Sequence, residues 1–152
     1  MDTRFSSAIH TLILISEAET PMTSEEIAIS VGTNASYIRK LTGMLKRKDI
    51  IDSRQGAKGF RLKVEPEELS LYSIYQAVSD SEQVHIFDLH QNPNDSCIVG
   101  RHIHPVLSQI FNGLEKEIEE ELRAQTLADC MDRMRKEMER SGENESGDTG
   151  RL

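Results

Sequence analysis

The sequence contains no tryptophan, two cysteines and four prolines in 152 residues. It also lacks a long hydrophobic run, since the longest stretch of large apolar residues near the start covers only residues 12–15, between His10 and Glu17. Such a stretch is far too short to span a bilayer or to form the core of a signal peptide. With 29% charged residues, the composition predicts a protein that stays in the cytoplasm, away from membranes.

Sequence patterns of enzyme active sites are also missing. The chain has no glycine-rich phosphate loop, no serine nucleophile motif with matching His and Asp, and no paired carboxylates at an identifiable pocket. Two cysteines in a cytoplasmic protein do not indicate a structural disulfide. The length suits one domain, or one small domain with an appendage. We therefore expect a binding protein and not an enzyme.

Positive charge is concentrated in one segment, although the formal net charge of the chain is -8. Residues 39–63 contain nine Lys or Arg and only two acidic residues, whereas residues 66–152 contain eight basic and eighteen acidic residues. A local basic patch can bind phosphates, because charges beyond a screening length of about 8 Å contribute little. The alternative is an ordinary solvated charged surface.

Two helices are predicted before this basic segment. Apolar residues at helical spacing predict the first helix over about residues 4–18. Thr23 and Glu26 form a capping-box pattern that begins a second helix. That helix buries Ile27 and Val31 and ends at Gly32, because glycine readily adopts the left-handed conformation at a helix end.

A third helix follows, with either Asn34 or Ser36 as its capping residue. Its inward apolar residues recur at spacings of three and four, at Ile38, Leu41 and Leu45. The remaining residues point mostly away from the core: Ser36, Tyr37, Arg39, Lys40, Gly43, Lys46 and Arg47. This mixture is typical of a helix in the DNA major groove, where Arg and Lys reach guanine edges or phosphates. The alternative is an amphipathic helix with a polar outer face.

A short basic hairpin is predicted next. Ile50 and Ile51 begin one strand, and Phe60 and Leu62 alternate on the returning strand. The tip between them contains two glycines and carries Arg54 and Lys58, with Arg61 beside it. An isolated two-stranded hairpin is only marginally stable, so it must pack on the helices, leaving its tip to project as a wing. Arginines of such a wing can enter the minor groove.

The rest of the chain predicts a helical dimerisation and sensing region over residues 66–140, after a winged helix-turn-helix DNA-binding unit over residues 1–65. One helix is expected to begin at Pro66, and a long one to run from about Pro105 to Gln125. The apolar stripe of the long helix comprises Val106, Leu107, Ile110, Phe111, Leu114, Ile118 and Leu122. This stripe predicts a subunit seam in a homodimer. Thr126 and Asp129 are expected to cap a short final helix, before a disordered tail over residues 141–152.

The predicted fold class is therefore mainly α, a winged helix-turn-helix with a small β-hairpin wing, plus a long dimerisation helix. Over residues 1–138 the chain resembles the Rrf-two family of bacterial winged-helix transcriptional regulators. The matching segments are residues 22–28 (MTSEEIA), 34–41 (NASYIRKL) and 54–62 (RQGAKGFRL), with Arg4-Phe5, Ala8 and His10 near the start. The family's usual wing has adjacent glycines where this chain has Lys58-Gly59.

The resemblance implies a homodimeric, sequence-specific regulator, usually a repressor, that binds double-stranded DNA. The predicted DNA-binding residues are Ser24, Ser36, Tyr37, Arg39, Lys40, Lys46, Arg54, Lys58 and Arg61. A rival hypothesis is that the winged helix has lost DNA affinity and serves as a dimeric scaffold, whose acidic C-terminal half meets a protein partner.

Cys97 is the candidate sensing residue. Cluster-binding members of the family hold an iron-sulfur centre with three closely spaced cysteines in the region of residues 85–104, and here Cys97 alone matches. A standard three-thiolate cluster is therefore not expected, so no cofactor is predicted. Cys97 lies in a polar turn next to cationic side chains, which lowers a thiol pKa and favours reaction with oxidants or electrophiles.

Two alternatives for Cys97 stay open. It is either a small packing residue or a ligand of a zinc site with His90, His102 or His104, although these residues lack a recognised ligand spacing. Cys130 lies on the Leu127 and Met134 side of the final helix, so we expect it to be a buried apolar residue.

Overall fold

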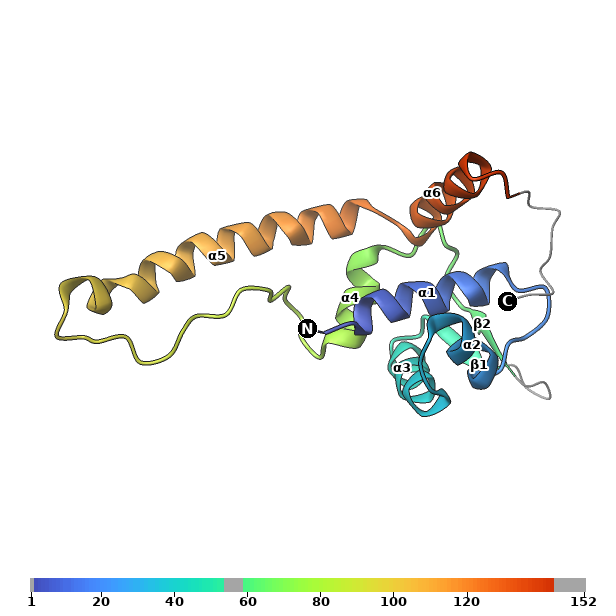
Figure 1. Ribbon diagram of the computed structural model, residues 1–152, viewed down its shortest axis with the longest axis horizontal. Coiled ribbons are helices and arrows are strands. Elements are labelled where there is room, and N and C mark those ends of the chain that lie inside the picture. Colours follow the sequence, from blue (N-terminus) through green and yellow to red (C-terminus); the bar gives the residue numbers. More distant parts are fainter. Residues whose placement is uncertain (1, 54–58, 144–152) are drawn as a thin grey trace.

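The computed structural model describes residues 2–53 and 59–143 of the chain. Within these ranges it has six helices and one two-stranded antiparallel sheet (Figure 1). The elements are α1 (Arg4–Glu17), α2 (Ser24–Val31), α3 (Ala35–Arg47), β1 (Ile51–Ser53), β2 (Phe60–Leu62), α4 (Leu71–Ser79), α5 (Ile98–Ala124) and α6 (Leu127–Arg140). The predicted mainly α fold with a small hairpin and a long helix is confirmed.

Local capping fixes the ends of α2 and α3. The Glu26 backbone N–H donates to the Thr23 hydroxyl over 3.2 Å, and the Thr23 backbone N–H donates to the Glu26 carboxylate over 3.3 Å. Gly32 ends α2 with a φ of 82°, as predicted. Of the two candidate caps for α3, the structure uses Asn34, whose side chain accepts from the Tyr37 N–H over 2.9 Å.

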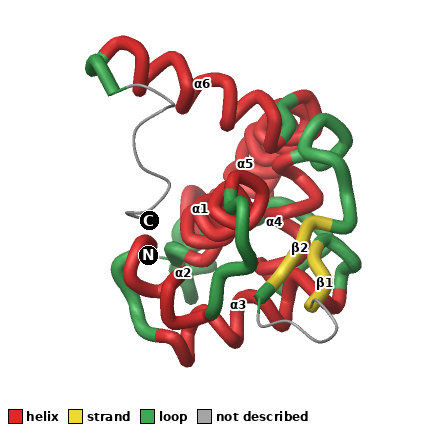
Figure 2. The backbone as a smooth tube through the Cα atoms, turned by 90° about the vertical axis from the view of Figure 1, so that its right-hand side faces the viewer, coloured by secondary structure: helices red, strands yellow, loops and turns green. Residues whose placement is uncertain are grey.

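One hydrophobic core joins α1 to α4 with α6. Figure 2 shows α1 to α4 and the hairpin close together, with α6 above them. Leu12 of α1, Ile27 of α2 and Ile38 of α3 are fully buried in this core. Ile74 of α4 and Leu127 of α6 are buried in the same core. Each such side chain stabilises the fold by about 1.5 to 3 kcal/mol relative to an exposed position. We call this compact part, residues 2–79 and 125–143, the body.

The hairpin packs on the helices of the body, as expected. β1 and β2 pair antiparallel, with Ile51 opposite Leu62 and Asp52 opposite Arg61. Ile51 is fully buried, and Phe60 and Leu62 pack against the core. Arg54 and Lys58, which the sequence assigns to the wing tip, lie outside the described residues, as does the predicted tail from residue 144 on.

The predicted start of α4 at Pro66 is wrong, since the helix begins at Leu71 with Ser70 as its capping residue. The backbone before it is used for pairing with the α5–α6 junction. The Leu71 N–H donates to the Gln125 carbonyl over 2.9 Å, and the Leu127 N–H donates to the Leu69 carbonyl over 2.8 Å. Residues 66–68 form a turn and Ser70 is extended, where the apolar pattern predicts helix.

The predicted start of α5 near Pro105 is also wrong, because the helix begins seven residues earlier, at Ile98. Pro105 lies inside it, where it lacks the N–H that would donate to the Arg101 carbonyl. Figure 1 shows α5 and the preceding loop extending away from the body, and we call residues 80–121 the arm. None of the helices within the described ranges is long and apolar enough to cross a membrane.

Candidate nucleic-acid interface

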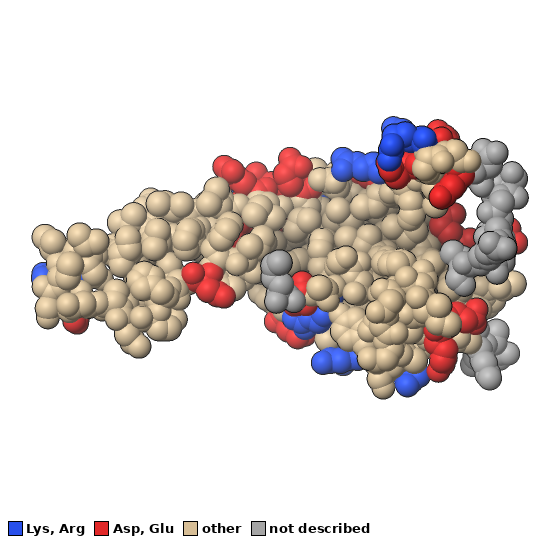
Figure 3. Space-filling view, in the orientation of Figure 1, with Lys and Arg blue, Asp and Glu red and all other residues tan. Residues whose placement is uncertain are grey.

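The outer side of α3 carries the polar residues predicted to read DNA. Ser36, Arg39, Lys40 and Lys46 are exposed, while Tyr37 is half-buried against the core. At about 100° per residue these exposed positions share one side of the helix. Figure 3 shows Lys and Arg side chains along the lower edge of the molecule, where Figure 1 places α3. Because its apolar residues pack into the core, α3 exposes a polar, mostly basic side to solvent.

The first turn of α2 lies beside this surface. Ser24 is the first residue of α2 and is half-buried. Nη1 of Arg39 lies 3.1 Å from Oε1 of Glu25, so an ion pair joins α2 to α3. Lys40 makes no hydrogen bond or ion pair within residues 2–53 and 59–143. The two adjacent cations of α3 therefore differ in their contacts, since Arg39 is paired with Glu25 and Lys40 has no partner in the described residues.

The other end of the surface is formed by the hairpin. The Lys46 ammonium donates to the Ser53 hydroxyl of β1 over 2.8 Å, which joins α3 to the sheet. Arg61 of β2 pairs with Asp52 of β1 across the strands, at 3.3 Å. The polar side of α3 is therefore joined to β1 through Ser53, and Arg61 lies on the strand paired with β1.

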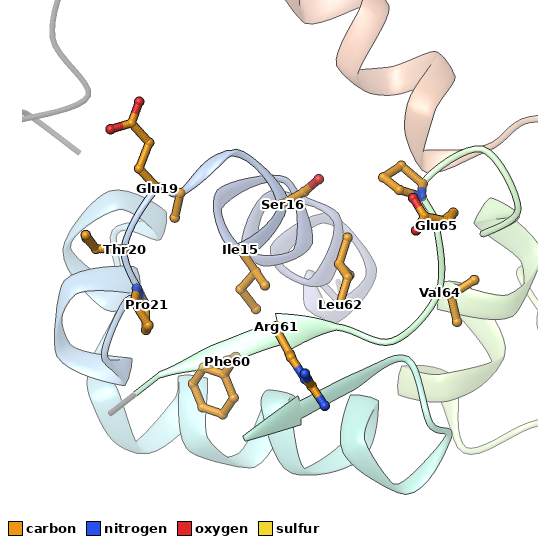
Figure 4. Close-up of a pocket in the computed structure, with 12 residues that line it drawn as sticks. Ile15, Ser16, Glu19, Thr20, Pro21, Phe60, Arg61, Leu62, Val64 and Glu65 are labelled. Carbon is orange, nitrogen blue, oxygen red and sulfur yellow. The ribbon is translucent and has the colours of Figure 1, made fainter. Parts of the chain in front are cut away.

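The base of the wing is seated on the loop between α1 and α2. Gly59 has a φ of 132°, and a Cβ atom there would lie 2.9 Å from the Pro21 backbone. In Figure 4 Ile15 and Leu62 lie between α1 and β2, while Arg61 extends toward β1. These residues line an open hollow of about 340 Å³. The close contact of Gly59 with Pro21 holds the start of β2 against the loop between α1 and α2.

The acidic and hydroxyl partners on this surface, Glu25, Asp52 and Ser53, were not among the predicted site residues. In α2 the sequence motifs indicated the helix ends, two buried residues and Ser24 as a DNA-binding residue, but no role for Glu25. Opposite charges on the two helices of a helix-turn-helix could have indicated the contact between Glu25 and Arg39, because α2 and α3 pack directly on each other. Spacing along one helix gives no such signal, since the two residues are 14 positions apart.

Cys97 lies at the far end of the arm, as the exposed N-cap residue of α5. The backbone N–H groups of Gly100 and Val99 at the helix start lower the pKa of its thiol. Asn94 accepts from the Cys97 N–H over 3.2 Å, and a Cβ atom on Gly100 would collide with the same Asn94 carbonyl. Glycine at position 100 therefore allows this turn to close against the first turn of α5.

Cys130 has the opposite environment. It is half-buried on α6, packs against the core, and burial raises the pKa of its thiol. The two thiols of the chain therefore differ in both access and acidity.

The arm loop is tied to α5 by a buried carboxylate. Glu115 accepts from the Phe87 N–H over 3.2 Å and lies 3.7 Å from Nδ1 of His85. The hydrogen bond from His85 to Asp88, at 2.7 Å, raises the pKa of His85, and Glu115 adds to the effect. The rings of Phe87 and Phe111 pack with centroids 5.2 Å apart.

The histidines near Cys97 bond to the backbone. Nδ1 of His102 lies 2.7 Å from the Ile98 carbonyl oxygen, and Nε2 of His104 lies 2.7 Å from the His90 carbonyl oxygen. In the part of the chain that the structure describes, no three His, Cys, Asp or Glu side chains come together as a metal site.

A three-helix unit with capped α2 and α3 and a hairpin seated against it defines a winged-helix protein. The sequence profile of the Rrf2 family, described as iron-dependent transcriptional regulators, matches residues 1–133. The chain belongs to the Rrf2 family, whose members are transcriptional regulators and not enzymes. The resemblance stated from the sequence motifs is thereby confirmed.

Individual relatives agree with this family. The chain is 39% identical over 134 residues to YwnA of Bacillus subtilis (strain 168), which its name assigns to the HTH-type transcriptional regulators, covering 88% of this chain and 98% of YwnA. It is 38% identical to a protein whose crystal structure is described as that of a DNA-binding protein, with a TM-score of 0.68 over 84% of this chain and 98% of that one. IscR of T. potens, at 22% identity, shares the fold with a TM-score of 0.66 over 88% of this chain and 87% of its own.

Proposed function

We propose that the chain is a homodimeric, sequence-specific DNA-binding transcriptional regulator, that it acts as a repressor, and that Cys97 makes it responsive to oxidants or electrophiles. The observation that carries DNA binding is the exposed side of α3, with Arg39, Lys40 and Lys46 beside the wing residue Arg61. A helix of this kind fits the major groove, where Arg and Lys bind guanine edges and phosphates. The description of a 38% identical protein as DNA-binding supports the same proposal.

The open side of α5 supports a homodimer. Val106 is 51% exposed, Ile110 50% and Leu114 42%, and the three lie along one side of the helix. With 27 residues, α5 is about 40 Å long, and Figure 1 shows much of it beyond the body. A second copy of α5 would cover this stripe and place two α3 helices on one duplex.

The environment of Cys97 supports thiol-based sensing. The side chain is exposed and its thiol pKa is lowered by the backbone at the start of α5, so its thiolate is available to oxidants. Modification of Cys97 would alter the first turn of α5, which is the proposed dimer helix. Repression is what the family resemblance implies, and a regulator of this kind is expected to work in the cytoplasm, where bacterial DNA lies.

We further infer that the chain works without a three-thiolate iron-sulfur cluster, although the family is described as iron-dependent. The whole sequence has only two cysteines, and Cys130 is packed against the core of the body. The donor set near Cys97 consists of histidines and one thiol, which does not match the thiolate ligands that clusters usually require.

The test is an electrophoretic shift of the duplex upstream of the chain's own gene, repeated across salt concentrations. Specific binding is expected, with log affinity falling against log salt by a slope of about -0.9 for each phosphate neutralised. Arg39→Ala is expected to lose about 1 to 3 kcal/mol of specific binding free energy with the fold unchanged. An unchanged affinity would show that Arg39 is not one of the DNA-binding residues. Absent or salt-insensitive binding of the unmodified chain would favour the rival scaffold hypothesis.

A further inference from the structure

The ion pair between Glu25 and Arg39 places a negative charge on the proposed DNA-binding surface. Oε1 of Glu25 lies 3.1 Å from Nη1 of Arg39, and the two side chains are 66% and 56% exposed. A duplex lying against α3 would therefore meet the carboxylate and the guanidinium together. A carboxylate at this position repels phosphates, which is unexpected on a surface that binds only by charge.

The local reason for this carboxylate is a modest one, since an acidic residue in the first turn of α2 interacts favourably with the helix dipole by about 0.3 to 1 kcal/mol. The capping box at the start of α2 uses Thr23 and Glu26, and Glu25 takes no part in it. The Glu25 carboxylate forms no hydrogen bond other than the one from Arg39 within the described ranges. An ion pair as exposed as this one contributes little to folding stability.

We propose that Glu25 is a specificity-determining residue that acts by positioning Arg39, an inference that rests on the proposed DNA-binding function. Glu25 holds Nη1, and the Nε and Nη2 groups make no hydrogen bond in the described part of the chain. A guanine edge offers two acceptors that match such a planar fork, so Arg39 can bind it while still paired with Glu25.

Non-specific DNA lacks this compensation. A phosphate that approaches Arg39 carries a full negative charge and is repelled by the Glu25 carboxylate, whereas a guanine edge is uncharged. Glu25 therefore weakens binding to arbitrary sequence more than binding to the operator. Specificity commonly arises from such a penalty against the wrong partner.

Lys40 provides the internal contrast. It neighbours Arg39 on α3 but pairs with no carboxylate in the described residues, so it is free to bind any phosphate. Lys40→Ala should therefore weaken binding to all sequences by a similar factor, whereas a change at Glu25 should alter the ratio between sequences.

The experiment measures anisotropy titrations of the full chain against two duplexes, the gene's own upstream region and a shuffled duplex of equal length and composition. Glu25→Gln is expected to raise affinity for the shuffled duplex by about fivefold and to change upstream affinity by less than about twofold. The specificity ratio should therefore fall by a factor of about 2.5 or more. Glu67→Gln removes one exposed acidic charge from the turn before α4, which bonds to the start of α6 through the Pro66 carbonyl, and should leave the ratio unchanged.

Two further variants separate positioning from simple charge and from misfolding. In an Arg39→Ala background, Glu25→Gln should no longer change the ratio. Glu25→Asp keeps the carboxylate and should keep most of the wild-type ratio, and it replaces Glu25→Gln as the comparison if circular dichroism shows that the Gln variant unfolds.

An unchanged ratio in Glu25→Gln, an equal gain on both duplexes, or an undiminished effect without Arg39 would each overturn the role of Glu25. If Glu25→Gln unfolds, a ratio in Glu25→Asp as low as that predicted for the Gln variant would overturn it too. A wild-type chain that binds both duplexes equally, or neither, would instead overturn the proposed function.

Discussion

The body and the arm treat their apolar residues in opposite ways. In the body, Leu12, Ile27 and Ile38 are each fully buried within a single chain. In the arm, Val106, Ile110 and Leu114 remain exposed, and the one buried residue of α5 is the charged Glu115. The body therefore completes its own core, whereas the arm leaves a surface that a second chain can complete.

The largest effect is expected in the core of the body. Ile38→Ala should lower the free energy of unfolding by about 2 to 5 kcal/mol, because it removes packed methyl groups and leaves a cavity. Ile110→Ala should change it by less than about 0.5 kcal/mol when measured at a concentration where the chain is monomeric. Chemical denaturation of both variants tests this contrast. Equal losses would mean that the arm is packed as tightly as the body.

The next effect concerns the open side of the arm. Ile110→Asp should raise the dissociation constant of the homodimer by about thirtyfold or more, about 2 kcal/mol, because it buries a charge in the proposed seam. Asn112→Asp adds the same charge at an exposed position on another side of α5 and serves as the control. Sedimentation equilibrium measures both. Unchanged association in Ile110→Asp would exclude this side of α5 as the seam.

The two thiols distinguish the arm from the body chemically. At pH 7 iodoacetamide should alkylate Cys97 at least about tenfold faster than Cys130, because the thiolate is the nucleophile and the two pKa values shift in opposite directions. As pH falls, the Cys97 rate should decline around a midpoint below the ordinary thiol pKa of about 8.5. Mass spectrometry of each peptide gives the rates.

Denaturant and mutation provide the controls for the thiols. In urea the alkylation rates of Cys97 and Cys130 should converge, because unfolding removes both the start of α5 beside Cys97 and the core around Cys130. Cys97→Ser should keep DNA binding and lose the response to oxidants. An identical response in mutant and wild type would eliminate Cys97 as the sensor.

The smallest effect tests whether α6 belongs to the body. The Asp129 N–H donates to the Thr126 hydroxyl over 3.2 Å, and the Thr126 N–H donates to Asp129 over 2.9 Å. Thr126→Ala should therefore lower the free energy of unfolding by about 1 kcal/mol, as Thr23→Ala should at the start of α2. A thermal melt of each variant measures this loss of stability. No loss in Thr126→Ala would place α6 outside the cooperative unit.

The body was largely predictable because its signals are local. Capping residues such as Thr23 and Asn34 act within three positions, and the apolar spacing of Ile38, Leu41 and Leu45 set which side of α3 faces solvent. The Thr126 cap that restarts the helix after α5 was predicted for the same reason. The predicted division at residue 65 stays a prediction. The elements α4 and α6, which follow that residue, pack in the same core as α1 to α3.

The errors came from contacts that the apolar pattern of a single helix does not record. Leu69 and Leu71 pair with backbone more than fifty residues away, which no pattern around Pro66 records. Pro105 suggested a helix start by its usual preference, yet the turn at Asn94 and Gly100 begins α5 earlier. The pairing of Glu25 with Arg39 was likewise invisible to a search within single helices.

The central claim is that two copies of α3 read one duplex from a single dimer. Hydroxyl-radical footprinting of the full chain on its upstream DNA tests it most directly. Two protected stretches are predicted, with centres about 34 to 36 Å apart or a multiple of that distance, and both should weaken together in Arg39→Ala. A single protected stretch, or protection that Arg39→Ala leaves intact, would contradict the claim.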